Sequence, residues 1–120
     1  MNGHVDRAGR ALVTLRVRPN DRAQVADLIA WVDTAFTGEL VVPFREIQRL
    51  GLKQSSTIMA GLADGSQKLL DTYSCLVEWL EEERGIEVIE SDGLLPLLGV
   101  GLLKSCRLKI DYRLATLIIK

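Results

Sequence analysis

The sequence predicts an all-β fold of mostly short antiparallel strands, with two short helices. Three observations predict this class. Apolar and polar residues alternate with a period of two over 11–18 and again over 69–79, which is the pattern of half-buried strands. The pair Asp64-Gly65 lies between two apolar runs and is a strong hairpin signal. Helical spacing of apolar residues is confined to short stretches, the clearest of which is 44–50.

The composition indicates one globular domain that covers residues 1–120. Hydrophobic residues make up 48% of the chain and charged residues 26%, and no repeat or linker interrupts them. The net charge of −1 gives no reason to expect a nucleic-acid partner or a membrane surface. The longest apolar run, 94–103, is broken by Pro96, Gly99 and Gly101, and it is far shorter than the ~20 apolar residues of a membrane helix.

Few residues suit metal binding or covalent catalysis. His4 is the only histidine, and Cys75 and Cys106 lack Cys-x-x-Cys spacing. This argues against a His-based metal site and against Ser-His or Cys-His catalysis, so we expect no metal and no other cofactor. We interpret both thiols as reduced and buried in a cytoplasmic protein, with a disulfide between them as the unsupported alternative. The polar first residues do not resemble a signal peptide.

Turn-forming residues mark most of the expected element boundaries. Residues 19–21 (Pro-Asn-Asp) separate the first two strands, which therefore form a hairpin, and Gly51 is placed to end the first helix. The expected helices cover 44–50 and about 100–104. The expected strands cover 11–18, 23–32, 40–42, 57–63, 69–79, 86–90, 107–112 and 114–119.

An acidic run, 81–85 (Glu-Glu-Glu-Arg-Gly), follows the long strand 69–79. Consecutive acids could indicate a cation site, but before a turn glycine they far more often form a solvated loop. We expect such a loop to end the long strand. The chain then returns as strand 86–90 and turns again at 91–93 (Ser-Asp-Gly).

The last strand, 114–119, contains almost no polar residues. An exposed apolar strand at a terminus aggregates unless it is paired. Two arrangements satisfy this requirement. The strand pairs within its own subunit, or the tails of two subunits build a shared sheet.

The most informative stretch surrounds Asp33. Residues 28–32 form a short apolar run that fits a buried strand, and Asp33 ends it. Positions 34, 35, 37 and 38 hold small or turn-forming residues, so the chain bends sharply and leaves backbone N–H groups near the carboxylate. An acid at the tip of a buried turn is costly unless it is hydrogen-bonded or functional. On these residues alone, Asp33 is either a turn cap or a catalytic carboxylate.

Three segments carry a family resemblance. Segment 32–43 reads Val-Asp-Thr-Ala-Phe-Thr-Gly-Glu-Leu-Val-Val-Pro, 62–66 reads Leu-Ala-Asp-Gly-Ser, and 96–103 reads Pro-Leu-Leu-Gly-Val-Gly-Leu-Leu. In this order and spacing they resemble the active-site turn, the flap tip and the late glycine-containing segment of retropepsin-like aspartic proteases. The first segment is closest to a small prokaryotic branch whose turn reads Asp-Thr-Gly-Phe-Thr-Gly, and the opening 3–13 also resembles that branch.

The resemblance implies half of a closed β-barrel, completed as a homodimer, with aspartic endopeptidase activity on an extended peptide or protein segment. Asp33 and Thr34 are then the catalytic residues: Asp33 of each subunit activates one water, and Thr34 bonds across the dimer. The resemblance also favours pairing of the terminal strand between subunits. The residues implied to contact the substrate are Ala35, Phe36, Thr37, Gly38, Ala63, Asp64, Gly65, Leu97 and Leu98.

Two departures from the family pattern keep a second function open. Ala35 stands where the family has Gly, and at a positive φ its methyl group would cost about 1 kcal/mol or more. Gly101 stands where the branch commonly has Asp. The alternative is a catalytically weak or inactive relative that serves as a dimeric peptide-binding module. An unrelated small ligand-binding β-barrel is a third possibility, which requires all three motif matches to be coincidental.

Overall fold

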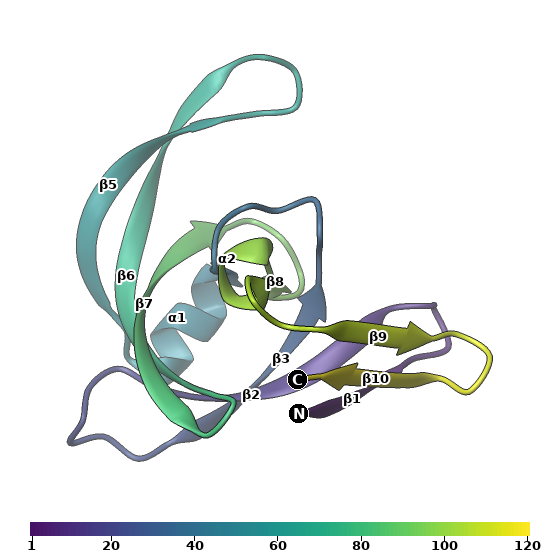
Figure 1. Ribbon diagram of the computed structural model, residues 1–120. Helices are drawn as coiled ribbons and strands as arrows, with labels where there is room; N and C mark the ends of the chain where they lie inside the picture. The colour runs from purple at the N-terminus through teal and green to yellow at the C-terminus, as the bar shows by residue number, and fades with distance from the viewer.

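The computed structural model describes residues 1–120 as strands joined by short turns, with two short helices (Figure 1). The helices are α1 (Phe44–Leu50) and α2 (Val100–Leu103). The strands are β1 (Asn2–Val5), β2 (Ala11–Arg18), β3 (Ala26–Val32), β4 (Leu40–Pro43), β5 (Lys53–Gly61), β6 (Gln67–Trp79), β7 (Glu82–Ser91), β8 (Leu97–Leu98), β9 (Leu108–Asp111) and β10 (Thr116–Ile119).

All strands belong to one sheet, in the order β5-β6-β7-β4-β8-β3-β2-β1-β10-β9. An additional pairing of β6 with β2 brings the sheet back on itself, so that its middle part is closed into a barrel. The β5–β6 hairpin extends well beyond this barrel, and the β9–β10 hairpin projects from another side (Figure 1). The predicted all-β class with two short helices is confirmed.

The first hairpin forms where the alternation placed it. β2 has the predicted bounds 11–18 and pairs antiparallel with β3 from Leu12↔Trp31 to Val17↔Ala26. β3 begins three residues later than expected, because residues 19–23 form a longer turn in which the Ala23 N–H donates to the Asn20 carbonyl at 3.4 Å. The apolar faces of both strands lie in a cluster of 24 buried residues, the hydrophobic core.

Helix α1 has its predicted bounds. Gly51 follows it at a φ of +69°, the left-handed conformation typical of a residue that ends a helix. Its N–H donates to the Gln48 carbonyl at 3.1 Å. The helix buries Ile47 and Leu50 against the core.

The prediction for the acidic run was wrong. A two-residue turn, Leu80-Glu81, joins β6 to β7, and Trp79 pairs with Glu82 directly after it. The rest of the acidic run therefore lies within β7, and Leu80 and Glu81 adopt positive φ values of 49° and 74°. Such a turn matches the twist of a hairpin but usually contains Gly or Asn, so the local residues did not reveal it.

Two parallel contacts also lay outside the prediction. β8 lies between β3 and β4, parallel to β3 and antiparallel to β4. β4 in turn runs parallel to β7. Parallel strands are joined by long connections and not by tight turns, so turn residues in the sequence do not predict their pairing.

The expectation that the terminal strand pairs between subunits was wrong. β10 is bonded on both sides within its own chain, to β1 on one side and β9 on the other. This pairing buries Leu117 and Ile119, which are 1% and 0% exposed. The N-terminal strand β1, which the sequence analysis did not predict, supplies the partner. Neither helix is both long and apolar enough to cross a membrane.

Candidate functional site

The turn between β3 and β4 holds Asp33 in a fixed position. Its N–H donates to the Leu98 carbonyl at 2.9 Å, which continues the β3–β8 pairing by one residue. Its Oδ1 accepts a hydrogen bond from the Ala35 N–H at 3.0 Å. Oδ2 accepts no hydrogen bond within the chain, and the side chain is half-buried. One carboxylate oxygen is thus used to order the turn, and the other is free for a reactant.

Three further backbone hydrogen bonds join this turn to the segment that begins α2. The Gly99 N–H donates to Glu39 at 3.0 Å, the Val100 N–H to Phe36 at 2.8 Å and the Gly101 N–H to Gly38 at 2.9 Å. The first and the late sequence motif are therefore one structural unit. This unit fixes the turn with backbone contacts on both sides.

Close packing explains the glycines in this unit. A Cβ atom on Gly99 would lie 2.3 Å from the Gly38 carbonyl oxygen and 2.4 Å from the Phe36 ring. A Cβ atom on Gly101 would lie 2.8 Å from the same carbonyl group. Both approaches are shorter than real contacts, so only glycine lets the two segments come this close.

The β5–β6 hairpin turns at residues 62–66, where the flap tip was predicted. Gly65 has a φ of +86°, and the Leu62 N–H donates to the Ser66 carbonyl at 2.8 Å. Asp64 Oδ1 accepts hydrogen bonds from the Ser66 hydroxyl and N–H, which hold the pKa of Asp64 below its ordinary value. The tip is a tight, hydrogen-bonded turn at the end of a long, twisted hairpin (Figure 1).

A groove of about 450 Å³ lies between the β5–β6 hairpin and the β3–β4 turn. Phe36 lines it from the turn, and Gly61 and Leu62 line it from the β5–β6 hairpin. Val41 of β4 and Ile89 of β7 add apolar walls. The turn and the flap, which are remote in sequence, thus border one groove.

Solved structures resemble this arrangement. A retropepsin-like aspartic protease from Rickettsia conorii superimposes with a TM-score of 0.67 at 20% identity, over 99% of this chain and 88% of that chain. EIAV protease, in complex with the inhibitor HBY-793, matches with a TM-score of 0.60 at 15% identity, over 80% of this chain and 86% of that one. The retroviral protease-like domain of Ddi1 from Leishmania major matches with a TM-score of 0.51 at 18% identity, over 91% and 88%.

The chain has a retropepsin-like fold. No protein-family model and no curated protein sequence matches the chain. The likeness therefore concerns the fold. The assignment of the site depends on the geometry of the turn.

Within this retropepsin-like fold, the two departures from the family pattern cause no visible strain. Ala35 does not belong to the residues with positive φ, so its methyl group costs no backbone energy, and its side chain is exposed. Gly101 lies so close to Gly38 that any side chain there would clash. Neither residue therefore strains the turn.

The predicted site residues occupy three different environments. Thr34, Ala35 and Thr37 are exposed on the turn, and the Thr34 hydroxyl makes no hydrogen bond within the chain. Gly38 and Leu97 are half-buried. Leu98 is fully buried and does not line the groove. Ala63, Asp64 and Gly65 lie at the flap tip, outside the groove lining.

Sequence reasoning missed several groove residues. Val41, Leu69, Asp71, Ile89 and Glu90 line the groove, and none was proposed as a site residue. The alternation of β6 was the available signal, because it places Leu69 and Asp71 on the same side as the buried Tyr73. Without the position of β7, that side could not be linked to Phe36.

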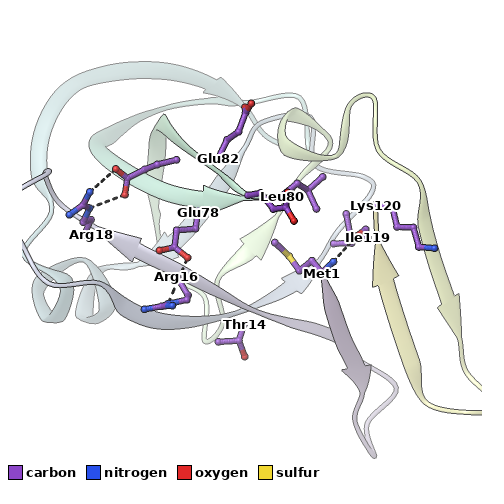
Figure 2. A pocket seen from close by; sticks show the side chains of 11 residues that line it. Met1, Thr14, Arg16, Arg18, Glu78, Leu80, Glu82, Ile119 and Lys120 are labelled. Carbon is purple, nitrogen blue, oxygen red and sulfur yellow. Dashed lines mark hydrogen bonds and ion pairs between the residues drawn. The ribbon is translucent and has the colours of Figure 1, made fainter.

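A second cavity, of about 860 Å³, lies away from this turn, between β2, the β6–β7 turn and the chain ends (Figure 2). Arg18 donates two hydrogen bonds to Glu83, at 2.8 and 2.7 Å, and Arg16 lies 3.8 Å from Glu78. The bond from Arg18 lowers the pKa of Glu83. None of the predicted site residues lines this cavity, and its arginines are already paired with acids.

Proposed function

We propose that this protein is an aspartic endopeptidase that acts as a homodimer and cleaves extended segments of other proteins or of its own precursor. The observation that carries the proposal is the environment of Asp33. Its carboxylate stands on a turn that is tied to β8 and α2 by backbone hydrogen bonds, and a groove begins three residues later at Phe36. The retropepsin-like fold supports this assignment.

The chemistry needs two carboxylates, and each chain supplies one. In a dimer with two-fold symmetry, Asp33 of one protomer faces Asp33 of its partner. Two carboxyl groups in contact share one proton, because both cannot ionise easily. The ionised group takes a proton from water, which attacks the scissile carbonyl carbon. The protonated group donates a hydrogen bond to the carbonyl oxygen, and the leaving amine takes up a proton when the C–N bond breaks.

The dimer needs an interface other than the tail strand, and β9 is the best candidate. It lies at one end of the sheet order, so only β10 pairs with it. The Arg107 and Lys120 backbones exchange hydrogen bonds, at 2.8 and 3.0 Å. In an antiparallel pair, every second residue of a strand bonds to its partner strand and the residues between them point the other way. Because Arg107 bonds to Lys120, the N–H groups of Leu108 and Ile110 point away from β10. Antiparallel pairing of two β9 strands would satisfy these groups and continue the sheet across the dimer.

The turn itself offers a second contact between protomers. Thr34 is exposed next to Asp33 and its hydroxyl has no partner in its own chain. Such a hydroxyl near the two-fold axis would bond to the partner turn and hold both carboxylates in register.

The two departures from the family pattern give little support to an inactive binding module, because Ala35 is unstrained and Gly101 is needed for packing.

Cleavage of a peptide library at mildly acidic to neutral pH tests the proposal. Wild type is compared with Asp33→Asn, each with and without pepstatin, after the dimer is confirmed by light scattering. We expect cleavage by wild type alone, and inhibition by pepstatin. Equal cleavage by the variant would refute the assigned chemistry. No cleavage by a confirmed dimer that still binds peptides would support the binding module instead.

A further inference from the structure

The groove beside Phe36 has an unusual electrostatic composition. Its walls are apolar at Val41, Leu69 and Ile89, but Asp71 and Glu90 also line it. The only cationic residue along the groove is Lys68, which lies 3.7 Å from the exposed Asp92. Neither Asp71 nor Glu90 takes part in an ion pair. The groove therefore has two carboxylates whose charge the chain does not neutralise.

Asp71 and Glu90 are the residues next to the last pair of the β6–β7 register. Thr72 of β6 pairs with Ile89 of β7, and continuing this antiparallel register by one residue sets Asp71 opposite Glu90. Both lie on the same side as Tyr73 and Val88, which are 7% and 0% exposed, so both point to the inner face of the sheet. Like charges in this cross-strand position destabilise a sheet.

Tyr73 reports on the charge at this position. Its hydroxyl donates a hydrogen bond to Glu90 Oε1 at 2.8 Å, and Thr57 Oγ1 lies 3.4 Å from Asp71 Oδ1. The hydrogen bond to Glu90, burial and the charges of Glu90 and Asp71 together raise the pKa of Tyr73 to about 12. These neutral donors orient the carboxylates but leave their negative charge in place.

We propose that this groove selects peptides with a lysine or arginine side chain, and that Asp71 and Glu90 are specificity-determining residues. The inference rests on the proposed peptidase function. The aliphatic stem of the basic residue lies along Val41, Leu69 and Ile89, and its cationic end reaches the two carboxylates. This arrangement relieves the repulsion between Asp71 and Glu90 and forms charge-assisted hydrogen bonds. Because Phe36 borders the groove, the basic residue lies near the cleaved bond.

The test uses pairs of peptides that differ at one position, with arginine in one and its uncharged isostere citrulline in the other. Wild type is compared with the double variant Asp71→Asn, Glu90→Gln, in which Gln can still accept the bond from Tyr73. Glu82→Gln, at the remote β6–β7 turn, serves as the control. We expect wild type and the control to prefer arginine in kcat/KM by about tenfold or more. The double variant loses the preference and cleaves the citrulline peptide at the wild-type rate.

Two measurements keep this inference separate from the proposed function. Binding of the same peptides to Asp33→Asn, followed by fluorescence anisotropy, reports on the preference without cleavage and weakens as salt rises. Titration of Tyr73 by its absorbance should give a lower pKa in the double variant than in wild type, because the charges of Glu90 and Asp71 are lost while burial remains. Cleavage with no arginine preference, or an arginine preference that the double variant keeps, would overturn this inference and leave the proposed peptidase function standing. Competition by millimolar Ca²⁺ instead of a basic peptide would also overturn it.

Discussion

The N–H of Asp33 donates a hydrogen bond to the carbonyl oxygen of Leu98 at 2.9 Å. This single bond connects the residue that carries the proposed chemistry to the short strand between β3 and β4. Leu98 is fully buried and belongs to the core, so the backbone of Asp33 is anchored to close-packed residues. The Oδ2 atom of the Asp33 carboxylate accepts no hydrogen bond from the chain.

Replacement of this carboxylate tests the chemistry. Asp33→Asn should lower kcat/KM by roughly 10²–10⁴-fold or more, because the amide neither accepts a proton from water nor shares one with the partner. The amide oxygen still accepts the bond from the Ala35 N–H, so the thermal midpoint should stay close to that of wild type. Asp27→Asn, at an exposed position of β3, is the matched control and should retain activity.

Close packing at Gly99 predicts a loss of stability. Gly99→Ala places a methyl group 2.3 Å from the Gly38 carbonyl oxygen, so the turn must move. The free energy of unfolding should fall by about 1–3 kcal/mol, measured by urea denaturation. Gly85→Ala is the control, since a Cβ there meets only Leu76, at 3.8 Å. Equal effects of the two changes would show that the turn and α2 are not tightly joined.

The β6–β7 turn offers a stabilising change. Glu81 has a φ of +74°, a conformation that costs about 1–2 kcal/mol for residues with a Cβ atom. Glu81→Gly should therefore raise the free energy of unfolding by about 0.5–1 kcal/mol, after the extra chain entropy of glycine is counted. Glu82→Gly, one residue later in β7, should lower it. A thermal midpoint that falls in Glu81→Gly would contradict the turn geometry.

The outer edge of β9 predicts how protomers associate. Ile110→Pro removes an N–H that points away from β10, so the pairing within the chain survives while pairing with a second β9 is blocked. We expect monomers by light scattering and loss of cleavage. Ile110→Ala keeps the N–H and should remain dimeric at the same protein concentration. A dimer in both variants would exclude this interface.

Alkaline pH should weaken the fold through Tyr73. Its pKa is raised from 10.0 to about 12 in the folded chain, chiefly by the hydrogen bond to Glu90, so the folded state holds the phenol proton more tightly. This contribution is fully present below pH 10 and is lost as the pH rises toward 12. Tyr73→Phe should flatten the loss of stability in that window. Denaturation curves at several pH values, at fixed protein concentration, measure it.

Local chemistry made much of this fold predictable. The alternation of 11–18 and the glycine after 44–50 led to β2 and α1 with their observed bounds. The Asp64-Gly65 pair marked the flap turn, and the motif around Asp33 marked the site turn. These features depend on residues within a few positions of one another, so the sequence alone carries them.

Other features depend on residues that meet only after folding. Leu80-Glu81 forms a tight turn because β6 and β7 pair continuously from Thr72 to Trp79, against the preference of those two turn residues. β10 pairs with β1, which is too short to be recognised as a strand from its residue pattern.

The sequence by itself determined which residues turn, which alternate and where Asp33 stands in the chain, because backbone preferences and side-chain period act locally. Only the tertiary structure decided that Leu98 ties Asp33 to the core, that β9 ends the sheet, and that Asp71 and Glu90 line one groove. Those relationships come from strand pairing between distant segments. The energy of such pairing depends on every neighbouring strand, so no short stretch of sequence encodes it.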